Sequence, residues 1–316
     1  MTRIRPSAPP ARSRAARFFF AHLGTLSSIV LYVVVAERAG WSTAGVTRAL
    51  WLALGVQTTY LLLARALDEH KQFDLVVWVL YAAGALAALA GLDGVLLAYR
   101  RYFGALLFGS FALATVAPLL LGREPFTVWH AVRQTPRWQH GTPWFAEANR
   151  VLAWFWAGVF VAAALSCLAR PTDPMFTLVY PNLLVLLVGL PATRWLPPLW
   201  FRFFPPPLPD TAVPLIMGMP LAFDPAAAGT ARAVFQFRVS GEDAGDYVVR
   251  VAEGRCESFE GTAEAADLLV ETSDAVWVGI VRGEIDGLQA LVERRYAVHG
   301  DLELLAKLGQ WFRPAA

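Results

Sequence analysis

The chain changes character over residues 197–214, which read PPLWFRFFPPPLPDTAVP. Aromatic residues surround Arg202 in the first half of this stretch, and such a mixture is typical of the interface between a membrane and water. The run of prolines at 205–207 favours polyproline II, a stiff conformation that advances about 3.1 Å per residue. We therefore interpret 197–214 as a linker that holds the residues after it a short, fixed distance from a bilayer.

The composition differs on the two sides of this linker. The 316 residues are 56% hydrophobic and 16% charged, with a mean hydropathy of +0.46. Residues 1–211 hold 18 Lys and Arg against 9 Asp and Glu, a net charge of +9, whereas residues 212–316 hold 9 against 16, a net charge of −7. This composition argues against an ordinary cytosolic enzyme, a disordered protein or a nucleic-acid-binding protein. It predicts a multi-domain protein with a basic membrane domain, 1–196, and an acidic domain, 215–316.

The first domain is predicted to be an all-α membrane bundle of about six helices. Crossing the hydrocarbon core takes ~20 mostly apolar residues. Segments of this kind occur at 18–36, 49–65, 75–91, 104–121, 151–169 and 177–196. Their cores contain no Asp, Glu, Lys or Arg away from the ends, apart from Arg194. Because buried charge usually marks a transport pathway, this pattern favours an anchor over a transporter, and we expect Gln57 and Asn182 to bridge neighbouring helices.

The distribution of Lys and Arg predicts the orientation of the bundle. With a cytoplasmic N-terminus, the inside segments collect 13 Lys and Arg, and the outside loops collect 5. The positive-inside rule then favours a multi-pass protein of the bacterial inner membrane with both termini in the cytoplasm. Arg100 and Arg101 would lie in an outside loop and form the contrary pair.

A cytoplasmic loop at 122–150 mixes aromatic and basic side chains. This mixture favours contact with the anionic headgroup layer, or an interfacial helix that packs against the bundle. His130 and His140 have no Cys or carboxylate at metal-ligand spacing, so we expect no metal site. The stretches Pro125-Phe126-Thr127 and 133–136 resemble a loop of uncharacterised bacterial inner-membrane proteins with six helices, a resemblance that implies no activity.

The acidic domain alternates short apolar runs with Gly-bearing turns, a pattern typical of β-strands. Four strands, expected to form an antiparallel meander, lie at 234–239, 247–251, 256–259 and 268–270. Helical patterns follow at 274–281 and 286–292, then a short strand at 296–298. Asp301 is the expected N-cap of a closing helix. About 100 residues in this order predict an α+β domain.

Several stretches of this domain are similar, in order and spacing, to the sterol carrier protein type-2 family. They are Met219-Pro220, Phe223-Asp224-Pro225, Phe235-Gln236-Phe237 with Gly241, Asp267-Leu268-Leu269-Val270 with Thr272, the helix from Trp277 to Arg282-Gly283-Glu284, and Val298-His299-Gly300-Asp301. The resemblance covers residues 215–313. It implies a five-stranded sheet covered on one side by helices, with an apolar tunnel for lipid-like ligands. It also implies that the domain is non-catalytic and that His299 lies in a turn before the last helix, without a role in acid–base catalysis.

Apolar side chains of the sheet and its helices would line such a tunnel. The candidate lipid-binding residues are Phe235, Phe237, Trp277, Ile280, Leu288, Leu291, Leu305, Leu308 and Phe312. For any one of them, ordinary core packing is the alternative. We also expect Trp311 and Phe312 to be exposed, where they would close the tunnel or dip into a membrane.

No Gly-rich phosphate loop, paired-Cys motif or Gly-x-Ser-x-Gly motif occurs in the sequence, so we expect no enzyme activity and no cofactor. The sequence favours membrane-tethered binding or transfer of an apolar lipid, such as a sterol, a prenyl quinone or an acyl lipid, with a membrane-bound enzyme as a further partner. Two alternatives stay open. The first is a protein-interaction or regulatory module on a membrane anchor, whose acidic surface would suit a basic partner. The second is a transporter with a regulatory tail.

Overall fold

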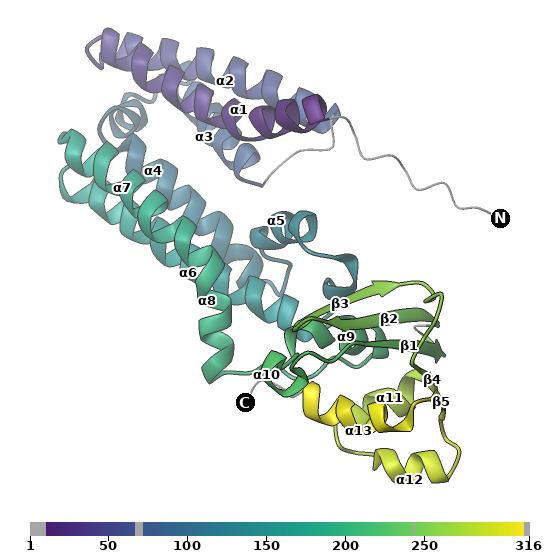
Figure 1. Cartoon of the computed structure of the whole chain (residues 1–316). Coiled ribbons are helices and arrows are strands. Elements are labelled where there is room, and N and C mark those ends of the chain that lie inside the picture. Colours follow the sequence, from purple (N-terminus) through teal and green to yellow (C-terminus); the bar gives the residue numbers. More distant parts are fainter. Residues whose placement is uncertain (1–10, 67–71, 243, 313–316) are drawn as a thin grey trace. The chain divides into compact units, whose positions relative to one another are not determined.

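The computed structural model describes residues 11–66, 72–242 and 244–312, with the side chains of 11–24 outside the description. The chain forms two compact units (Figure 1). The helical unit comprises the residues up to 131 together with 149–197, and the α+β unit comprises 132–148 together with 198–316. A segment from the middle of the chain therefore belongs to the same unit as the C-terminal region.

Helices make up the helical unit. Their bounds are α1 (Ala11–Arg38), α2 (Thr43–Ala66), α3 (Gln72–Leu89), α4 (Asp93–Leu120), α5 (Phe126–Gln134), α6 (Pro143–Ala169), α7 (Tyr180–Leu183) and α8 (Leu190–Phe203). Of these, α5, α6 and α8 extend beyond the bounds of the unit into residues of the α+β unit. Within the described residues, the helical stretches long and apolar enough to cross a membrane are Thr43–Ala66, Gln72–Leu89, Asp93–Leu120, Pro143–Ala169 and Met175–Phe203. Each overlaps one predicted segment, and the first predicted segment falls within α1. A helical N-terminal region is thus confirmed, whereas its insertion into a membrane stays a prediction.

The last long helical stretch contains wide turns close before prolines. The π-helical stretches Met175–Val179 and Leu184–Gly189 precede Pro181 and Pro191. In a regular α-helix a proline ring clashes with the carbonyl four residues earlier, and a π turn changes the position of that carbonyl. The helix continues to Phe203, so the linker that we predicted to start at 197 starts after that residue.

Arg100 and Arg101 lie inside α4 rather than in a loop. The helix starts at Asp93, whose negative charge suits the positive end of the helix dipole. Both arginines are exposed, and the backbone departs from helical geometry just after them at Tyr102, with φ −124° and ψ 20°. The two arginines that count against the predicted orientation therefore lie in a helix, about two turns after its start.

The Gln57 side chain joins α1, α2 and α3 and is fully buried. Its amide accepts a hydrogen bond from Ser28 Oγ (2.8 Å) and donates to Thr25 Oγ1 (3.2 Å) and to the Asp74 carbonyl (2.9 Å). These contacts confirm that Gln57 bridges neighbouring helices. Asn182 instead donates to a carbonyl one turn earlier in its own helix and is exposed, so our prediction that it bridges helices is wrong.

Helix α3 also buries a carboxylate just before the predicted segment 75–91. Asp74 is 3% exposed, and its carboxylate accepts hydrogen bonds from Thr25 Oγ1 (2.5 Å) and Tyr60 Oη (3.4 Å). Burying a charged group is costly unless hydrogen bonds compensate for the lost water. The helical unit therefore contains a buried acidic side chain that hydropathy alone did not indicate.

The α+β unit contains one five-stranded sheet. Its strands are β1 (Ala233–Ser240), β2 (Gly245–Ala252), β3 (Arg255–Glu260), β4 (Leu268–Ser273) and β5 (Ala297–Gly300), in the order β3-β2-β1-β4-β5. The β1–β2, β2–β3 and β4–β5 pairs are antiparallel, whereas β4 runs parallel to β1 with Phe237 opposite Val270. The strands that we predicted are confirmed. The antiparallel meander is correct only for β1 to β3, because the chain crosses from β3 at one edge of the sheet to β4 on the far side of β1.

Short helices complete this unit: α9 (Ala212–Met217), α10 (Pro225–Ala228), α11 (Asp274–Val281), α12 (Gly287–Val292) and α13 (Leu302–Trp311). The side chains of Ser273, Asp286 and Asp301 accept hydrogen bonds from backbone N–H groups in the first turns of α11, α12 and α13. Such caps satisfy donors that have no partner within the helix. The predicted N-cap at Asp301 is confirmed.

Two hydrogen bonds of the Gln236 side chain hold the crossover between β3 and β4, and Gly300 of β5 lies close to the end of this crossover. The Gln236 side chain is 5% exposed, accepts a hydrogen bond from the Ala263 N–H (2.8 Å) and donates to the Gly261 carbonyl (3.2 Å). Gly300 has a φ of +109°, and a Cβ atom on it would lie 2.3 Å from the Asp267 carbonyl oxygen. Only glycine suits that position, and the close approach lets β5 enter the sheet beside β4.

The loop that we predicted at 122–150 divides between the two units. At its start, the Phe126 ring packs against Phe73 in the helical unit, with centroids 4.7 Å apart. Residues 132–148 belong to the α+β unit, where the Trp138 ring lies 3.8 Å from the position that a Cβ atom of Gly218 would take. The expectation that this loop packs against the bundle is therefore correct only for its first part, because residues 132–148 belong to the α+β unit.

Candidate functional site

One face of the sheet is apolar. Alternate residues of a strand point to the same face, and on β1 these are Ala233, Phe235, Phe237 and Val239, none of which is more than 3% exposed. β2 and β4 contribute buried side chains opposite them, namely Tyr247, Val249, Val251, Leu268 and Val270. The alternation of three neighbouring strands thus builds one continuous apolar surface.

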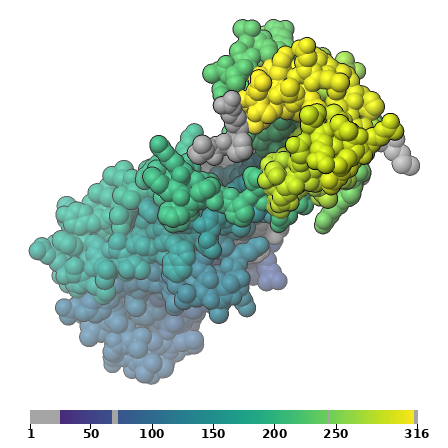
Figure 2. Space-filling model, turned by 90° about the horizontal axis from the view of Figure 1, so that it is seen from below, coloured from purple at the N-terminus to yellow at the C-terminus, as the bar shows by residue number. Residues whose placement is uncertain are grey.

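Helices cover this surface and place aromatic rings against it. The Trp277 ring of α11 lies edge to face on Phe237, with centroids 5.0 Å apart, and the Trp311 ring of α13 lies edge to face on Phe235, with centroids 6.1 Å apart. Edge-to-face contact is a favoured geometry for aromatic pairs. Figure 2 views the unit from the side where α12 and α13, in yellow shades, form the outer surface. The apolar interior therefore lies between the sheet and its helices.

Eight of the nine candidate lipid-binding residues lie in this interior. Phe235, Phe237, Trp277 and Leu308 are buried, and Ile280, Leu291, Leu305 and Phe312 are partly buried against them. Leu288 does not lie there: it is 72% exposed, because α12 turns Ala290 inward and leaves Leu288 and Val292 on its outer face. We therefore remove Leu288 from the candidate lining residues, and a role of the other eight in lipid binding stays a prediction.

Helix α9 supplies interior residues that our sequence analysis missed. Ala212 and Ile216 are fully buried within the same apolar cluster. Ser258 Oγ of β3 donates a hydrogen bond to the Met217 carbonyl (2.7 Å), which holds the end of α9 on the sheet. The run Ala-Val-Pro-Leu-Ile-Met was the available signal, but we assigned its first residues to the linker.

Trp311 is buried, contrary to our expectation that the C-terminal aromatic pair is exposed. It is 4% exposed, and its carbonyl accepts a hydrogen bond from the Asp224 N–H (2.7 Å). Phe312 forms a β-bridge with Phe223 and is partly buried. The end of α13 is thus tied to the segment that enters the sheet, and both rings belong to the interior.

Trp277 carries a polar group into this interior. The residue is 7% exposed, and its indole nitrogen is buried without a hydrogen-bond partner. Among the described residues of the α+β unit, no other buried side-chain nitrogen or oxygen is in this situation. Buried N–H groups are nearly always paired, so this donor is unusual.

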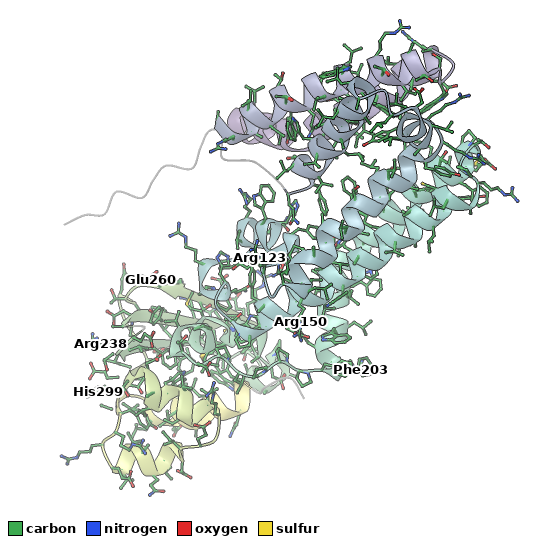
Figure 3. The ribbon with its side chains drawn as sticks, turned by 180° about the vertical axis from the view of Figure 1, so that it is seen from behind. Arg123, Arg150, Phe203, Arg238, Glu260 and His299 are labelled. Carbon is green, nitrogen blue, oxygen red and sulfur yellow. The ribbon has the colours of Figure 1, made fainter. Side chains whose placement is uncertain are left out.

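The opposite face of the sheet carries charged side chains beside the fully buried Val248. Arg238 of β1 lies between Asp246 of β2 (3.3 Å) and Glu271 of β4 (2.5 Å), and the His299 ring of β5 lies 3.5 Å from Glu271. Hydrogen bonds to Asp246 and Glu271 raise the pKa of Arg238 above its usual value. Figure 3 labels Arg238 and His299 near each other on the surface of this unit. Ion pairs thus join neighbouring strands on this face, and the face that carries Phe235 and Phe237 is the one that the helices cover.

The segment before α9 is attached to both ends of α11. Arg282, which follows α11, donates to the carbonyls of Leu208 and Pro209 (both 3.1 Å) and pairs with Asp210. At the start of α11, the Asp274 carboxylate accepts a hydrogen bond from the backbone N–H of the first residue of α9 (2.5 Å). The end of the linker is therefore part of the folded unit.

Cys256 of β3 lies opposite Val251 and packs partly buried against the apolar interior. Burial raises the pKa of its thiol to about 12, and the negative charge of Glu257 adds to the rise. A thiol with so high a pKa is protonated at neutral pH, which suits packing rather than nucleophilic chemistry. Within the part of the chain that the structure describes, no group of three or more His, Cys, Asp or Glu side chains is placed to hold a metal ion.

Comparison with known proteins finds a family that resembles the sheet and most of its helices. Residues 222–313 match the model of the SCP-2 sterol transfer family. The matched residues begin just before Phe223 and include all five strands together with α11, α12 and α13. A search of curated proteins found no match to the chain.

Solved structures of sterol carrier proteins are also similar to this chain. Palmitated SCP2L2 from Aedes aegypti is 18% identical, with a TM-score of 0.27 and coverage of 32% of this chain and 95% of that one. A crystal structure of sterol carrier protein 2 like 2 from the same organism is 21% identical, with a TM-score of 0.26 and coverage of 30% and 88%. Sterol carrier protein domain 2 of Helicoverpa armigera is 22% identical, with a TM-score of 0.24 and coverage of 26% and 67%.

Residues 222–313 of the C-terminal region match the SCP-2 sterol transfer family, and the resemblance that we drew from the sequence is confirmed for this region. The resemblance of the N-terminal region to six-helix inner-membrane proteins stays a prediction, and the function of the whole chain is taken up next.

Proposed function

We propose that this chain is a membrane-anchored protein that binds an apolar lipid and exchanges it with the adjacent leaflet or with a membrane-bound enzyme. One observation carries the proposal: the family match covers the residues that form an apolar sheet face beneath helices. Burial of apolar surface is the main driving force for binding a lipid. No reaction is assigned to the chain under this proposal.

The helical unit would provide the anchor. Five described helical stretches have the length and apolarity to span a bilayer, and the exposed apolar side chains on them suit contact with lipid. The excess of Lys and Arg on one side of these stretches supports a bacterial inner membrane with both termini in the cytoplasm. A fusion of green fluorescent protein to the C-terminus would fluoresce in that orientation, and a dark but stable fusion would contradict it.

The connection between the anchor and the domain is short. Only residues 204–211 separate α8 from α9, and contacts with Arg282 hold three of them on the α+β unit. A short connection keeps the domain at an effective concentration on the order of millimolar near the membrane. Tethering would therefore favour repeated exchange with one membrane over diffusion between membranes.

Native mass spectrometry of the full chain, released from nanodiscs of known lipid composition, tests the proposal. We expect one lipid per chain to remain bound to the full chain. The matched control is a chain that ends at Asp210, which keeps the helical unit and lacks the sheet and its helices α9 to α13. Equal lipid retention by both chains, or none by either, would reject lipid binding by the domain.

A second candidate function, transport through the helical unit, is favoured by the burial of Asp74. Buried acidic side chains in membrane helices often belong to ion or proton pathways, and this one lies among Thr25, Gln57 and Tyr60. Proteoliposomes that contain a pH-sensitive dye test it directly. A proton flux in the wild type that disappears in Asp74→Asn would support transport, and the absence of flux in the wild type would argue against proton transport.

A further inference from the structure

We infer that the indole N–H of Trp277 donates a hydrogen bond to an uncharged oxygen of the bound lipid. The domain would then prefer a lipid with a hydroxyl or carbonyl group over a hydrocarbon and over a carboxylate. This inference rests on the proposed function, because it specifies which lipid the same interior binds.

The position of the donor is the first step. Trp277 lies on α11, its ring packs edge to face against Phe237 at 5.0 Å, and both residues belong to the apolar cluster beneath the sheet. The indole nitrogen is buried and has no partner within the protein. An N–H group in an apolar interior gains more from an acceptor than one in water does, because no solvent competes for it.

The chemistry of the acceptor follows from the surrounding side chains. Among the described residues of the α+β unit, the buried polar side chains apart from Tyr and Trp are Gln236, Thr272 and Thr142, and none is Lys or Arg. Gln236 is hydrogen-bonded to the crossover, and Thr272 Oγ1 donates to the Ser273 carbonyl. A carboxylate in this interior would therefore lack a cationic partner, which makes its burial costly, whereas a hydroxyl or carbonyl oxygen needs only a neutral donor.

The nearest charges along α11 favour the same conclusion. Asp274 at its start is negative and accepts a hydrogen bond from the Ala212 N–H. Arg282 follows its end, and its guanidinium binds Asp210 and the linker carbonyls. The one cationic side chain at the ends of this helix is thus already paired, and it is not available to a carboxylate.

Probes that differ in a single group test the inference on the full chain in nanodiscs. The probes are dodecane, 1-dodecanol and dodecanoate, and the variants are Trp277→Phe and, as a matched control, Trp311→Phe, which makes the same change elsewhere in the interior. Because all proteins are compared in identical nanodiscs, partition of a probe into the lipid cancels. We expect Trp277→Phe to bind 1-dodecanol roughly fivefold more weakly, the effect of one net hydrogen bond, and to leave dodecane and dodecanoate unchanged. The control is expected to show no such selective loss for 1-dodecanol.

Nuclear magnetic resonance provides a second readout that does not depend on how well a variant folds. The indole resonance of Trp277 in the wild type is identified by its loss in Trp277→Phe or by single-site labelling. We expect this resonance to move downfield with 1-dodecanol and to move less with dodecane, because a hydrogen bond deshields the indole proton.

The outcomes separate the inference from the function on which it rests. If the wild type binds dodecane and 1-dodecanol, but Trp277→Phe changes both affinities equally and the resonance does not distinguish the probes, lipid binding stands and the role of Trp277 is rejected. Tighter binding of dodecanoate than of 1-dodecanol by the wild type would also reject the inference. If the wild type binds none of the three probes, the proposed lipid binding and the inference both fail.

Discussion

Phe237 and Trp277 pack edge to face, with ring centroids 5.0 Å apart and ring planes at 63°. Phe237 lies at the middle of β1, which pairs with β2 and β4, whereas Trp277 lies on the helix above them. This contact joins the sheet to its helical layer at the centre of the apolar interior. The stability of the domain and the shape of its interior therefore depend on the same two rings.

Phe237→Ala is expected to destabilise the α+β unit by about 3–5 kcal/mol, because it removes a fully buried ring. Hydrogen exchange of the β1 and β4 amides in the full chain measures this loss locally and avoids the assumption of two-state unfolding for a protein with two units. The matched control is Leu288→Ser, which changes a side chain that is 72% exposed and is expected to shift stability by less than about 0.5 kcal/mol. Similar losses in both variants would contradict the placement of these two residues.

Arg282→Ala is expected to loosen the segment before α9. The variant loses the hydrogen bonds to the Leu208 and Pro209 carbonyls and the ion pair with Asp210. Because these groups are partly exposed to water, we expect the backbone amides of Leu208 and of residues 210–212 to exchange only about three- to tenfold faster. Arg295→Ala, which removes the same charge from an exposed turn, should leave these amides unchanged, and unchanged exchange in Arg282→Ala itself would show that the contacts do not hold the segment.

Cys256 is expected to resist alkylation in the folded protein. Burial raises the pKa of its thiol from the ordinary value of 9.0 to about 12, so at pH 9 only about one thiol in a thousand is ionised, against about half in the unfolded chain. In a Cys167→Ala background, iodoacetamide should therefore react several hundredfold more slowly with folded than with urea-unfolded protein. Because the folded pKa is the higher one, the stability that depends on the protonated thiol is intact below pH 9 and falls as the pH rises towards 12. Equal alkylation rates at pH 9 would contradict the raised pKa.

Local patterns predicted most of the fold of the α+β unit. Strand alternation depends on neighbouring residues, so the positions of β1 to β5 were evident from runs such as 234–239. The cap at Asp301 is a contact with an adjacent turn and was evident for the same reason. Eight of the nine candidate residues lie in the interior because the apolar faces of β1, α11 and α13 follow from the same periodicities.

Contacts between distant residues account for what the sequence did not predict. The parallel pairing of β4 with β1 depends on a crossover that Gln236 holds by hydrogen bonds with residues far along the chain. The burial of Asp74 depends on hydroxyl groups that α1 and α2 supply to its carboxylate. The sequence also could not predict that the indole N–H of Trp277 lacks a hydrogen-bond partner, because this depends on every neighbour in the folded chain.

Gln57→Leu is expected to weaken the packing of α1, α2 and α3 by about 0.6 kcal/mol for each hydrogen bond lost, the average for hydrogen bonds between membrane helices. The variant leaves Ser28 Oγ and the Asp74 carbonyl without the amide that they contact. Unfolding of the full chain in mixed detergent micelles measures the loss. Asn182→Leu is the control, because its amide bonds only to its own helix and is exposed. If the two variants lost equal stability, Gln57 would not act as a bridge, whereas lipid binding by the α+β domain should be unchanged in both.

Gly300→Ala is expected to destabilise the α+β unit by at least 2 kcal/mol, or about thirtyfold in the folding equilibrium. The backbone at Gly300 has a φ of +109°, and a Cβ atom there would lie 2.3 Å from the carbonyl oxygen of Asp267, which belongs to the backbone and cannot rotate away. Gly309→Ala is the matched control: it lies within α13 with no neighbouring atom within 4 Å of an added Cβ, so alanine should stabilise the helix by about 0.5–1 kcal/mol. Hydrogen exchange at the β4–β5 pair reports both changes. Because Gly300 sets the entry of β5 beside β4, the same variant should also weaken lipid binding if the interior beneath the sheet is the binding site, and a destabilised domain with unaltered affinity would locate the lipid elsewhere.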